Sequence, residues 1–575
     1  MSASAHRANS DDNQPQTALT LWRWTFGMVA FFAAFAAYLS YDEFQTPSSI
    51  PLKSTTVATV PLFNAWTIGW NADRALHGFN GYWDAPIFYP ADDPFAFSEP
   101  QPATLLVAPV CWITGSAIAG YKAWLFLSLC LNGFFTALLL RRIGHGLFLQ
   151  LVGGTAVTLL PIVHQRIDVL QLVPVWGIIW FWSSLFELDK TPGRRTAAEL
   201  GISFAMCFAL CIHHGMFLSA TLPLATLVFI RRLPDRTFLT SSMQSMFLAA
   251  ILVVPIVAPI YSAADANAFA RKLWSVKKQS ATPEQLLATP SNSLIQFSQL
   301  ENSNRRRFNP GWLRMTFAVL GVTAAVVWGQ RRRWVVFLLL TAISATTLSL
   351  GLNLELFGWK PWQLISEYLP GFGQVRNVFR FVWLIQMSVV LLAIEGLATV
   401  LAICQKRFSK SFLKPALAVF VAIPGVILAT EVLPEDAQRG GVPDLARHKG
   451  WTQFIRENNT VNQPIVCLPF ASGNSINDFD VTTRWMIYGL EHRAPMVNGY
   501  SGFFPQTYFD LRNFVNAEFP SASVVEKLAD LDIQYIVVAR KYCESDKLLH
   551  TAAGRLTLVY QDDEAGIDVY RFANP

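Results

Sequence analysis

Charged residues are scarce in this chain. Only 15% of its 575 residues are charged and 52% are hydrophobic, whereas an ordinary soluble domain carries about 25% charged residues. The composition therefore excludes an ordinary soluble globular protein. The formal net charge of +6 comes with no zinc-finger spacing and no concentrated basic helix. We therefore expect no nucleic-acid partner, and a lipid bilayer as the main surroundings of the chain.

Sequence motifs for disulfide, zinc and nucleotide chemistry are also missing. The seven cysteines form no CxxC pair and lack metal-ligand histidine spacing, so they predict neither a disulfide framework nor a zinc site. For Cys467 and Cys543 two alternatives stay open, a single disulfide or two buried thiols. No GxGxxG, Walker or GxSxG motif occurs, which leaves a nucleotide site without support. The polar residues 1–20 lack the features of a cleavable secretory signal, so we expect the first apolar segment to be retained.

Long apolar runs dominate what is present. A membrane-spanning helix needs roughly 20 mostly apolar residues. Eleven segments meet this requirement, near 21–41, 121–140, 145–163, 169–186, 198–213, 215–231, 244–262, 312–329, 334–352, 381–403 and 415–433. With a cytoplasmic N-terminal tail at 1–20, every short inside connection carries Lys or Arg, as the positive-inside rule requires. The sequence predicts an α-helical polytopic protein of the cell inner (plasma) membrane, with about eleven spans over 21–433.

Three loops then lie on the outer side, at 42–120, 263–311 and 353–380. The apolar stretch 103–118 is interrupted by Pro109 and Gly115, and counting it as a crossing would reverse every later basic loop. We interpret it as an interfacial helix on the outer surface. The first loop is mainly acidic, and the second is mainly basic and includes the run from Arg305 to Arg307.

Residues 434–575 have the composition of a soluble domain of typical length. Strand-like runs such as PIVCLPF and IQYIVVAR alternate with helical runs such as KGWTQFIREN. This alternation predicts a small α/β domain. It follows the last apolar segment, so we expect it on the extracytoplasmic side.

An acidic loop and a basic loop on one side of a membrane protein favour a reaction on a lipid that carries phosphate. A carboxylate accepts a proton from a sugar hydroxyl as a general base. Arginines bind phosphate oxygens and stabilise the charge of a departing phosphate. The alternative is that outer loops are charged only because they are exposed to water.

Three segments resemble the GT-C superfamily of bacterial polytopic membrane glycosyltransferases. They are YWDAPIFYPADDPFAFSEPQPATLLVAPVCWITGS, LPGFGQVRNVFRFVWLIQMSVVLLAIEGLATVL and PMVNGYSGFFPQTYFDLRNF. The resemblance implies transfer of a sugar from a polyprenyl-phosphate donor to a lipid, glycan or protein acceptor at the outer face. It also implies a catalytic carboxylate just beyond the first span, here Asp42 or Glu43. The motif reads YDEF rather than DxD or ExD, so the choice between the two stays open.

Other charged residues are candidates for binding the substrate. We assign this role to Asp84, Glu99, His164, Arg166, Arg376 and Arg380. Arg376 and Arg380 are four residues apart and would share one face if the segment is helical, where they bind either a donor phosphate or lipid headgroups. Asp84 is a candidate ligand for a divalent metal, Mg or Mn, or else a turn residue. His213 and His214 are interpreted as caps of a tight helical hairpin.

Two other functions remain open. A transporter or flippase of a lipid-linked glycan would be favoured by charged residues in the middle of a span, and Glu395 is the clearest of the few. A noncatalytic scaffold of the cell envelope would function without the outer carboxylates.

The predicted orientation is testable with reporter proteins. We expect alkaline phosphatase fused to the C-terminus to be active and green fluorescent protein fused at the same place to be dark, because the last segment should end outside. Fusions in the basic connection near 190–195 should give the opposite pair. Fluorescence from the C-terminal fusion would contradict the topology.

Overall fold

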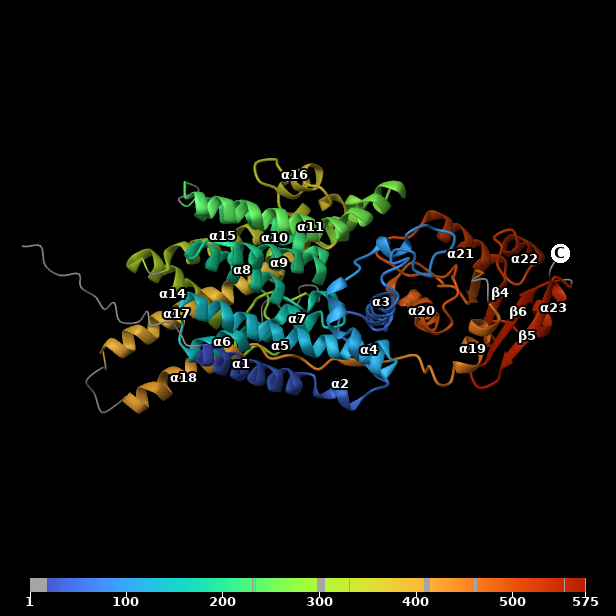
Figure 1. Cartoon of the computed structure of the whole chain (residues 1–575), viewed down its shortest axis with the longest axis horizontal. Coiled ribbons are helices and arrows are strands. Elements are labelled where there is room, and N and C mark those ends of the chain that lie inside the picture. The colour runs from blue at the N-terminus through green and yellow to red at the C-terminus, as the bar shows by residue number, and fades with distance from the viewer. Residues whose placement is uncertain are drawn as a thin grey trace, which may run out of the picture.

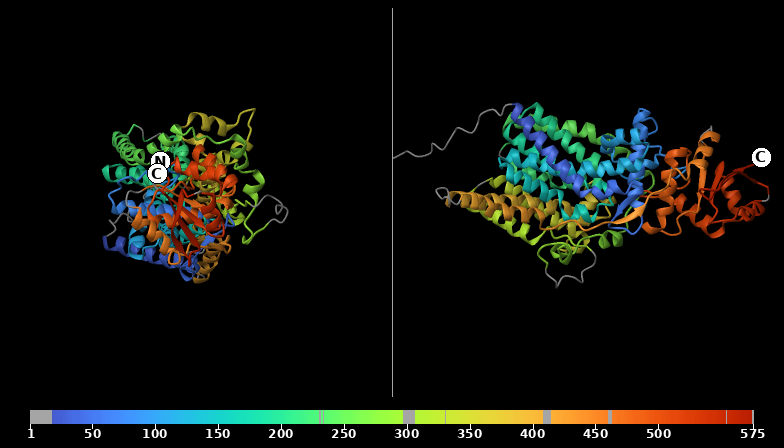
Figure 2. Two further views of the ribbon diagram at one scale, coloured as in Figure 1. Left: turned by 90° about the vertical axis from the view of Figure 1, so that its right-hand side faces the viewer. Right: turned by 90° about the horizontal axis from the view of Figure 1, so that it is seen from below.

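The structure is a computed structural model that describes residues 18–229, 232, 234–296, 306–329, 331–407, 414–459, 463–552 and 554–573. Most of the predicted tail, at 1–17, and Arg305 lie outside the described residues. The molecule is elongated, with a helical bundle at one end and a part containing a β-sheet at the other (Figure 1). Two further views show that the sheet lies beyond the end of the bundle and not beside it (Figure 2).

Each of the eleven apolar segments coincides with helical structure. The helices are α1 (Ala18–Leu39), α5 (Ala117–Ile143), α6 (Leu147–Thr158) with α7 (Pro161–Gln165), α8 (Trp176–Lys190), α9 (Arg194–Leu210), α10 (Ile212–Phe229), α11 (Arg236–Ala266), α14 (Trp312–Trp328), α15 (Arg332–Leu350), α17 (Val382–Arg407) and α18 (Lys414–Thr430). Within the described part of the chain, 6 helical segments are long and apolar enough to cross a membrane. The number of eleven crossings therefore stays a prediction.

The first loop folds into several short elements at the end of the bundle. They are α2 (Tyr41–Gln45), β1 (Ser49–Leu52), α3 (Thr59–Leu76), η1 (Pro94–Phe97), η2 (Pro102–Val107) and α4 (Ala108–Thr114). The stretch expected to form an interfacial helix contains η2, α4 and the first residues of α5. It is interrupted at Gly115, whose φ of 63° ends α4 in the left-handed conformation that glycine tolerates.

The C-terminal part contains a four-stranded mixed sheet. Its strands are β3 (Ile465–Leu468), β4 (Tyr535–Ala539), β5 (Leu556–Asp562) and β6 (Ile567–Phe572), and its helices are α19 (Lys449–Asn458), α20 (Asp480–His492), α21 (Gln506–Glu518), α22 (Ala522–Ala529) and α23 (Ser545–Thr551). The strand order is β3-β4-β6-β5, with β3 parallel to β4 and the other pairs antiparallel. Cys467 and Cys543 are both free thiols, so the alternative without a disulfide holds.

A second, two-stranded sheet connects the C-terminal part to the first loop. Strand β2 (Gln438–Gly441) pairs antiparallel with β1. The residues that directly follow the last apolar helix thus return to the segment that directly follows the first one. This pairing places Arg439 beside α2.

Asp168 holds the first loop on the helical bundle. Its buried carboxylate accepts hydrogen bonds from the backbone N–H groups of Lys53, Ser54 and Thr55, at 3.1, 2.6 and 3.0 Å. The Ser54 hydroxyl donates a further bond of 2.7 Å. A buried carboxylate is tolerated only when its charge is compensated in this way. The segment after β1 is therefore fastened to the turn between α7 and α8.

Replacing this carboxylate should weaken the whole outer end of the bundle. We expect Asp168→Asn to destabilise the protein by roughly 3 kcal/mol, because the amide nitrogen would face N–H donors in place of an anionic acceptor. The thermal midpoint of the purified protein measures the effect. The matched control is Asp530→Asn, at an exposed position, and equal midpoints for the two variants would contradict the role of Asp168.

Candidate functional site

Asp42 and Glu43 lie on α2 and share one basic partner. Oε1 of Glu43 is 2.6 Å from Nη1 of Arg439, and a carboxylate oxygen of Asp42 is 3.8 Å from Nη2. Burial raises the pKa of Glu43, and Arg439 only partly offsets this rise. The side chain of Asp42, in contrast, is 80% exposed. Glu43 therefore has a fixed partner in the fold, whereas Asp42 is accessible to a substrate.

Arg166 and Arg306 lie against the ring of Phe379. Their guanidinium carbons are 5.1 and 4.5 Å from the ring centroid, and Phe379 belongs to η8 (Val378–Phe381), directly before α17. Burial and the charge of Arg306 lower the pKa of Arg166 to about 10. Arg166 therefore remains cationic near neutral pH. The Nε–H of Arg166 is buried and has no hydrogen-bond partner among the described residues.

Glu99, His213 and Arg380 form a second group of charges in contact. The Glu99 carboxylate accepts a hydrogen bond of 3.1 Å from the backbone N–H of Ile212 and contacts Nδ1 of His213. Nη1 of Arg380 is 3.2 Å from the same nitrogen. Burial alone would raise the pKa of Glu99, but the charge and hydrogen bond of His213, the charge of Arg380 and a hydrogen bond from Cys211 lower it to about 2. Sequence reasoning missed this role of His213, because its only signal was a pair of adjacent histidines in a predicted outer turn.

Arg271 and Arg376 extend the positive charge toward the C-terminal part. The guanidinium carbon of Arg271 lies 3.7 Å from the ring centroid of Phe503, and its Nη2 donates a 2.8 Å hydrogen bond to the Gly502 carbonyl. Burial, together with the charges of Arg376 and Arg380, lowers the pKa of Arg271 to about 10. Arg376 itself is exposed.

Together these side chains form what we call the arginine group, which consists of Arg166, Arg271, Arg306, Arg376 and Arg380. Arg380 connects its two halves, since its charge acts on both Arg166 and Arg271. The two nearby carboxylates, Glu99 and Asp168, already accept several hydrogen bonds. Like that of Arg166, the buried Nε–H of Arg380 has no partner in the described part of the chain. The arrangement is suited to an anion with several oxygens.

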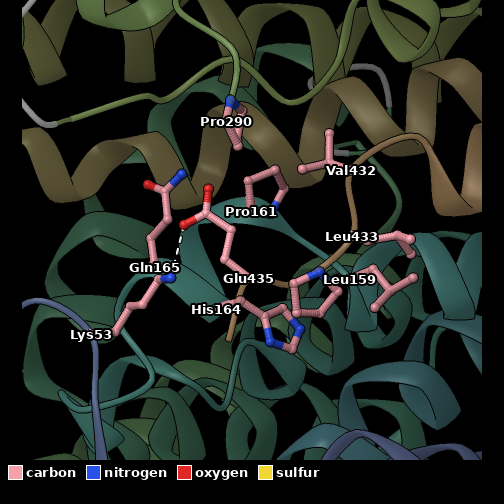
Figure 3. A pocket seen from close by; sticks show the side chains of 10 residues that line it. Lys53, Leu159, Pro161, His164, Gln165, Pro290, Val432, Leu433 and Glu435 are labelled. Atoms are coloured by element: carbon pink, nitrogen blue, oxygen red, sulfur yellow. Dashed lines mark ion pairs between the residues drawn. The ribbon is translucent and has the colours of Figure 1, made fainter. Parts of the chain in front are cut away.

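His164 is held apart from the arginine group. Its Nε2 makes a 2.9 Å hydrogen bond with the carbonyl of Thr158. It lines a small pocket, together with Gln165 and the ion pair of Lys53 and Glu435 at 2.8 Å (Figure 3). The cavity volume of about 10 Å³ holds about one water molecule. A space of this size is too small for a substrate. The binding role of His164 therefore gains no support from this pocket and stays a prediction.

The described residues form one cluster of potential metal ligands, and this cluster is poorly suited to a metal ion. Glu99, Cys211 and His213 have ligand atoms within 4.8 Å of one another. The guanidinium of Arg380, 3.2 Å from His213, would repel a cation there. Asp84 is not part of this cluster, and a divalent metal at Asp84 stays a prediction.

The buried Glu395 is explained by structural ion pairs. Its carboxylate oxygens lie 2.9 Å from Nε2 of His145 and 3.1 Å from Nη1 of Arg331. Arg331 directly precedes α15, and His145 lies between α5 and α6. Both partners lie at the ends of other helices, and they pair with the carboxylate that α17 (Val382–Arg407) carries near its middle. A structural role in these ion pairs therefore explains the residue that most favoured a transporter.

Comparison with known proteins shows a likeness of fold only. No family model and no curated protein matches the sequence. Among solved structures, the arabinofuranosyltransferase AftD from mycobacteria, determined by cryo-EM, matches with a TM-score of 0.52 and 15% sequence identity. The match covers 96% of this chain but 42% of that protein, so the chain spans less than half of its length. The chain therefore resembles that protein in fold, and it has candidate membrane-spanning helices.

The charge of Glu99 should make stability depend on pH. Its pKa in the fold lies below the ordinary value of a glutamate, so its contribution is present above about pH 4.5 and is lost as the pH falls toward 2. The difference corresponds to about 3 kcal/mol. We expect Glu99→Gln to lower the thermal midpoint at pH 7 and to flatten its decrease between about pH 5 and pH 3. Glu518→Gln, at an exposed site, should keep the original pH profile.

Proposed function

We propose that the protein is a membrane glycosyltransferase that transfers a sugar from a polyprenyl-phosphate donor to an acceptor at the outer face of the inner membrane. The likeness of the fold to an arabinofuranosyltransferase supports this reaction class. The single observation that carries the proposal is the arginine group, in which two buried guanidinium N–H donors have no partner among the described residues.

The arginine group provides the chemistry that a phosphate leaving group requires. The glycosidic bond breaks as charge accumulates on the departing polyprenyl phosphate, and nearby guanidinium groups stabilise that charge. Arg380 and Arg166 each present an Nε–H beside their terminal nitrogens, which is the fork that binds two phosphate oxygens at once. Because the pKa values of Arg166 and Arg271 stay near 10, both are protonated throughout the physiological range.

Asp42 is the stronger candidate for the general base. A base must reach the acceptor hydroxyl to remove its proton, and the exposed carboxylate of Asp42 is free to do so. Glu43 is buried against Arg439 and holds α2 in place. The Nζ of Lys122 reinforces this corner by donating to the carbonyls of Glu43 and Thr46, at 2.7 and 2.6 Å.

Substitution of the two acids separates these roles. We expect Asp42→Asn to lower transfer by about 10²-fold or more at unchanged thermal stability, because only the proton acceptor is lost. Glu43→Gln should lower the thermal midpoint through loss of the Arg439 ion pair. Mass spectrometry of cell-envelope glycolipids, with and without the gene, first identifies the transferred sugar, and complementation with each variant then measures transfer. Full transfer by both variants would rule out both acids as the base.

The phosphate role of the arginine group is tested by Arg380→Lys. Lysine keeps the charge but lacks the planar fork, so we expect a loss of roughly 10²-fold in transfer rate. The control is Arg456→Gln, at an exposed position on α19. Wild-type kinetics for Arg380→Lys, with respect to both the rate and the donor concentration, would argue against donor phosphate at this place.

A further inference from the structure

Two cavities of unlike character meet at Asp84. The first has a volume of about 510 Å³ and lies between the first loop and the end of α20, where Asp73, Arg74, Asp92 and Arg493 provide polar groups. The second has a volume of about 580 Å³. Asp84 lines both of them. Each volume is within the usual range of ligand-binding pockets.

The first cavity offers hydrogen-bonding groups of the kind that bind sugar hydroxyls. Asp73 is held by Arg493 at 2.9 Å, and this ion pair connects the first loop to the residue that follows α20. Asp84 is exposed and forms no ion pair or side-chain hydrogen bond within the described part of the chain. Free carboxylates accept hydrogen bonds from hydroxyl groups.

The second cavity is apolar and opens beside a lipid-facing helix. Its walls include the aromatic residues Phe79, Tyr82 and Trp83, together with Pro255 and Ile256 of α11. α11 is one of the candidate membrane spans, and only 11% of its most apolar stretch is buried in the protein. The C-terminal end of α11 lies beside the first loop (Figure 1).

An apolar track leads from this cavity along α11. Phe247, Ile251 and Val254 are 70%, 51% and 57% exposed, as expected for side chains that contact lipid tails. A molecule with a polar head and a hydrocarbon chain is therefore accommodated from Asp84 into the bilayer without a break.

We propose that these two cavities bind a lipid-linked sugar with an uncharged head. Its sugar lies in the polar cavity beside Asp84, and its lipid chain leaves through the apolar cavity along α11. The binding of this glycolipid goes beyond the proposed glycosyl transfer and does not depend on it.

The signs of charge separate this site from that of the donor. Four aspartates, Asp73, Asp84, Asp92 and Asp93, surround the two cavities, against the two arginines Arg74 and Arg493. A phosphate would be repelled here but attracted by the arginine group. An uncharged sugar meets no such barrier, so a phosphate-bearing donor and an uncharged glycolipid are sorted by charge.

Photocrosslinking tests the binding site without any need for transfer. The probe is a dodecyl glucoside with a diazirine in its alkyl chain, applied to the full-length protein in lipid nanodiscs. We expect labelled peptides that contain Leu105, a further wall residue of the apolar cavity, or the Pro255–Ile256 region. Dodecyl maltoside should compete with this labelling, whereas maltose alone should not. Competition by phosphatidylglycerol as strong as that by dodecyl maltoside would overturn the proposal, because it would indicate a site for lipid chains only.

Two variants examine the two halves of the site. Asp84→Asn should weaken competition by dodecyl maltoside about 10-fold, since a charged acceptor of hydrogen bonds is lost. Ile256→Trp should block labelling by filling the apolar cavity. Asp530→Asn, at an exposed position far along the sequence, serves as the control. Labelling spread over all lipid-facing helices and unchanged in both variants would overturn the proposal.

The two proposals fail in different ways. Specific labelling in cells whose glycolipids do not change on deletion of the gene would sustain the binding site and refute the transferase. A sugar missing from the glycolipids of the deletion strain, combined with nonspecific labelling, would sustain the transferase and refute this glycolipid site.

Discussion

A single buried carboxylate, that of Asp168, organises the outer end of the helical bundle. It accepts three consecutive backbone N–H groups from 53–55, so the first loop cannot leave the bundle without exposing an uncompensated buried charge. Arg166 lies only two residues before it and is thereby directed to Phe379 and Arg306. The same fastening keeps β1 in position to pair with β2, which brings Arg439 to Glu43.

Separation of charge is the second principle of this architecture. Positive side chains gather beside η8 and are only partly neutralised, whereas negative ones surround the cavities of the first loop. Concentrating like charges costs stability in the free protein. Such a cost is typical of a site that binds a ligand of opposite charge. The need to bind a ligand of negative charge explains why so few of these arginines form an ion pair with a carboxylate.

Some of the site was open to prediction because its signals are local. Asp42 and Glu43 directly follow an apolar run, and Arg376 and Arg380 directly precede another, so the membrane topology predicted from the sequence puts them on one side. The contributions of Arg271, His213 and Arg439 escaped prediction. Each of them meets its partner across a long stretch of sequence, and hydrophobic periodicity carries no information on such contacts.

The sequence by itself determined the class of the protein: its helices, its membrane and the unlike charges of its outer loops. These properties follow from hydrophobicity and charge, which act residue by residue. The tertiary structure decided which charges meet. It tied Glu43 to Arg439, joined Glu99 to His213 and Arg380, enclosed Asp168, and left Asp42 and Asp84 accessible. Burial and pairing are properties of three-dimensional packing, and only they distinguish a carboxylate that supports the fold from one that is free to react.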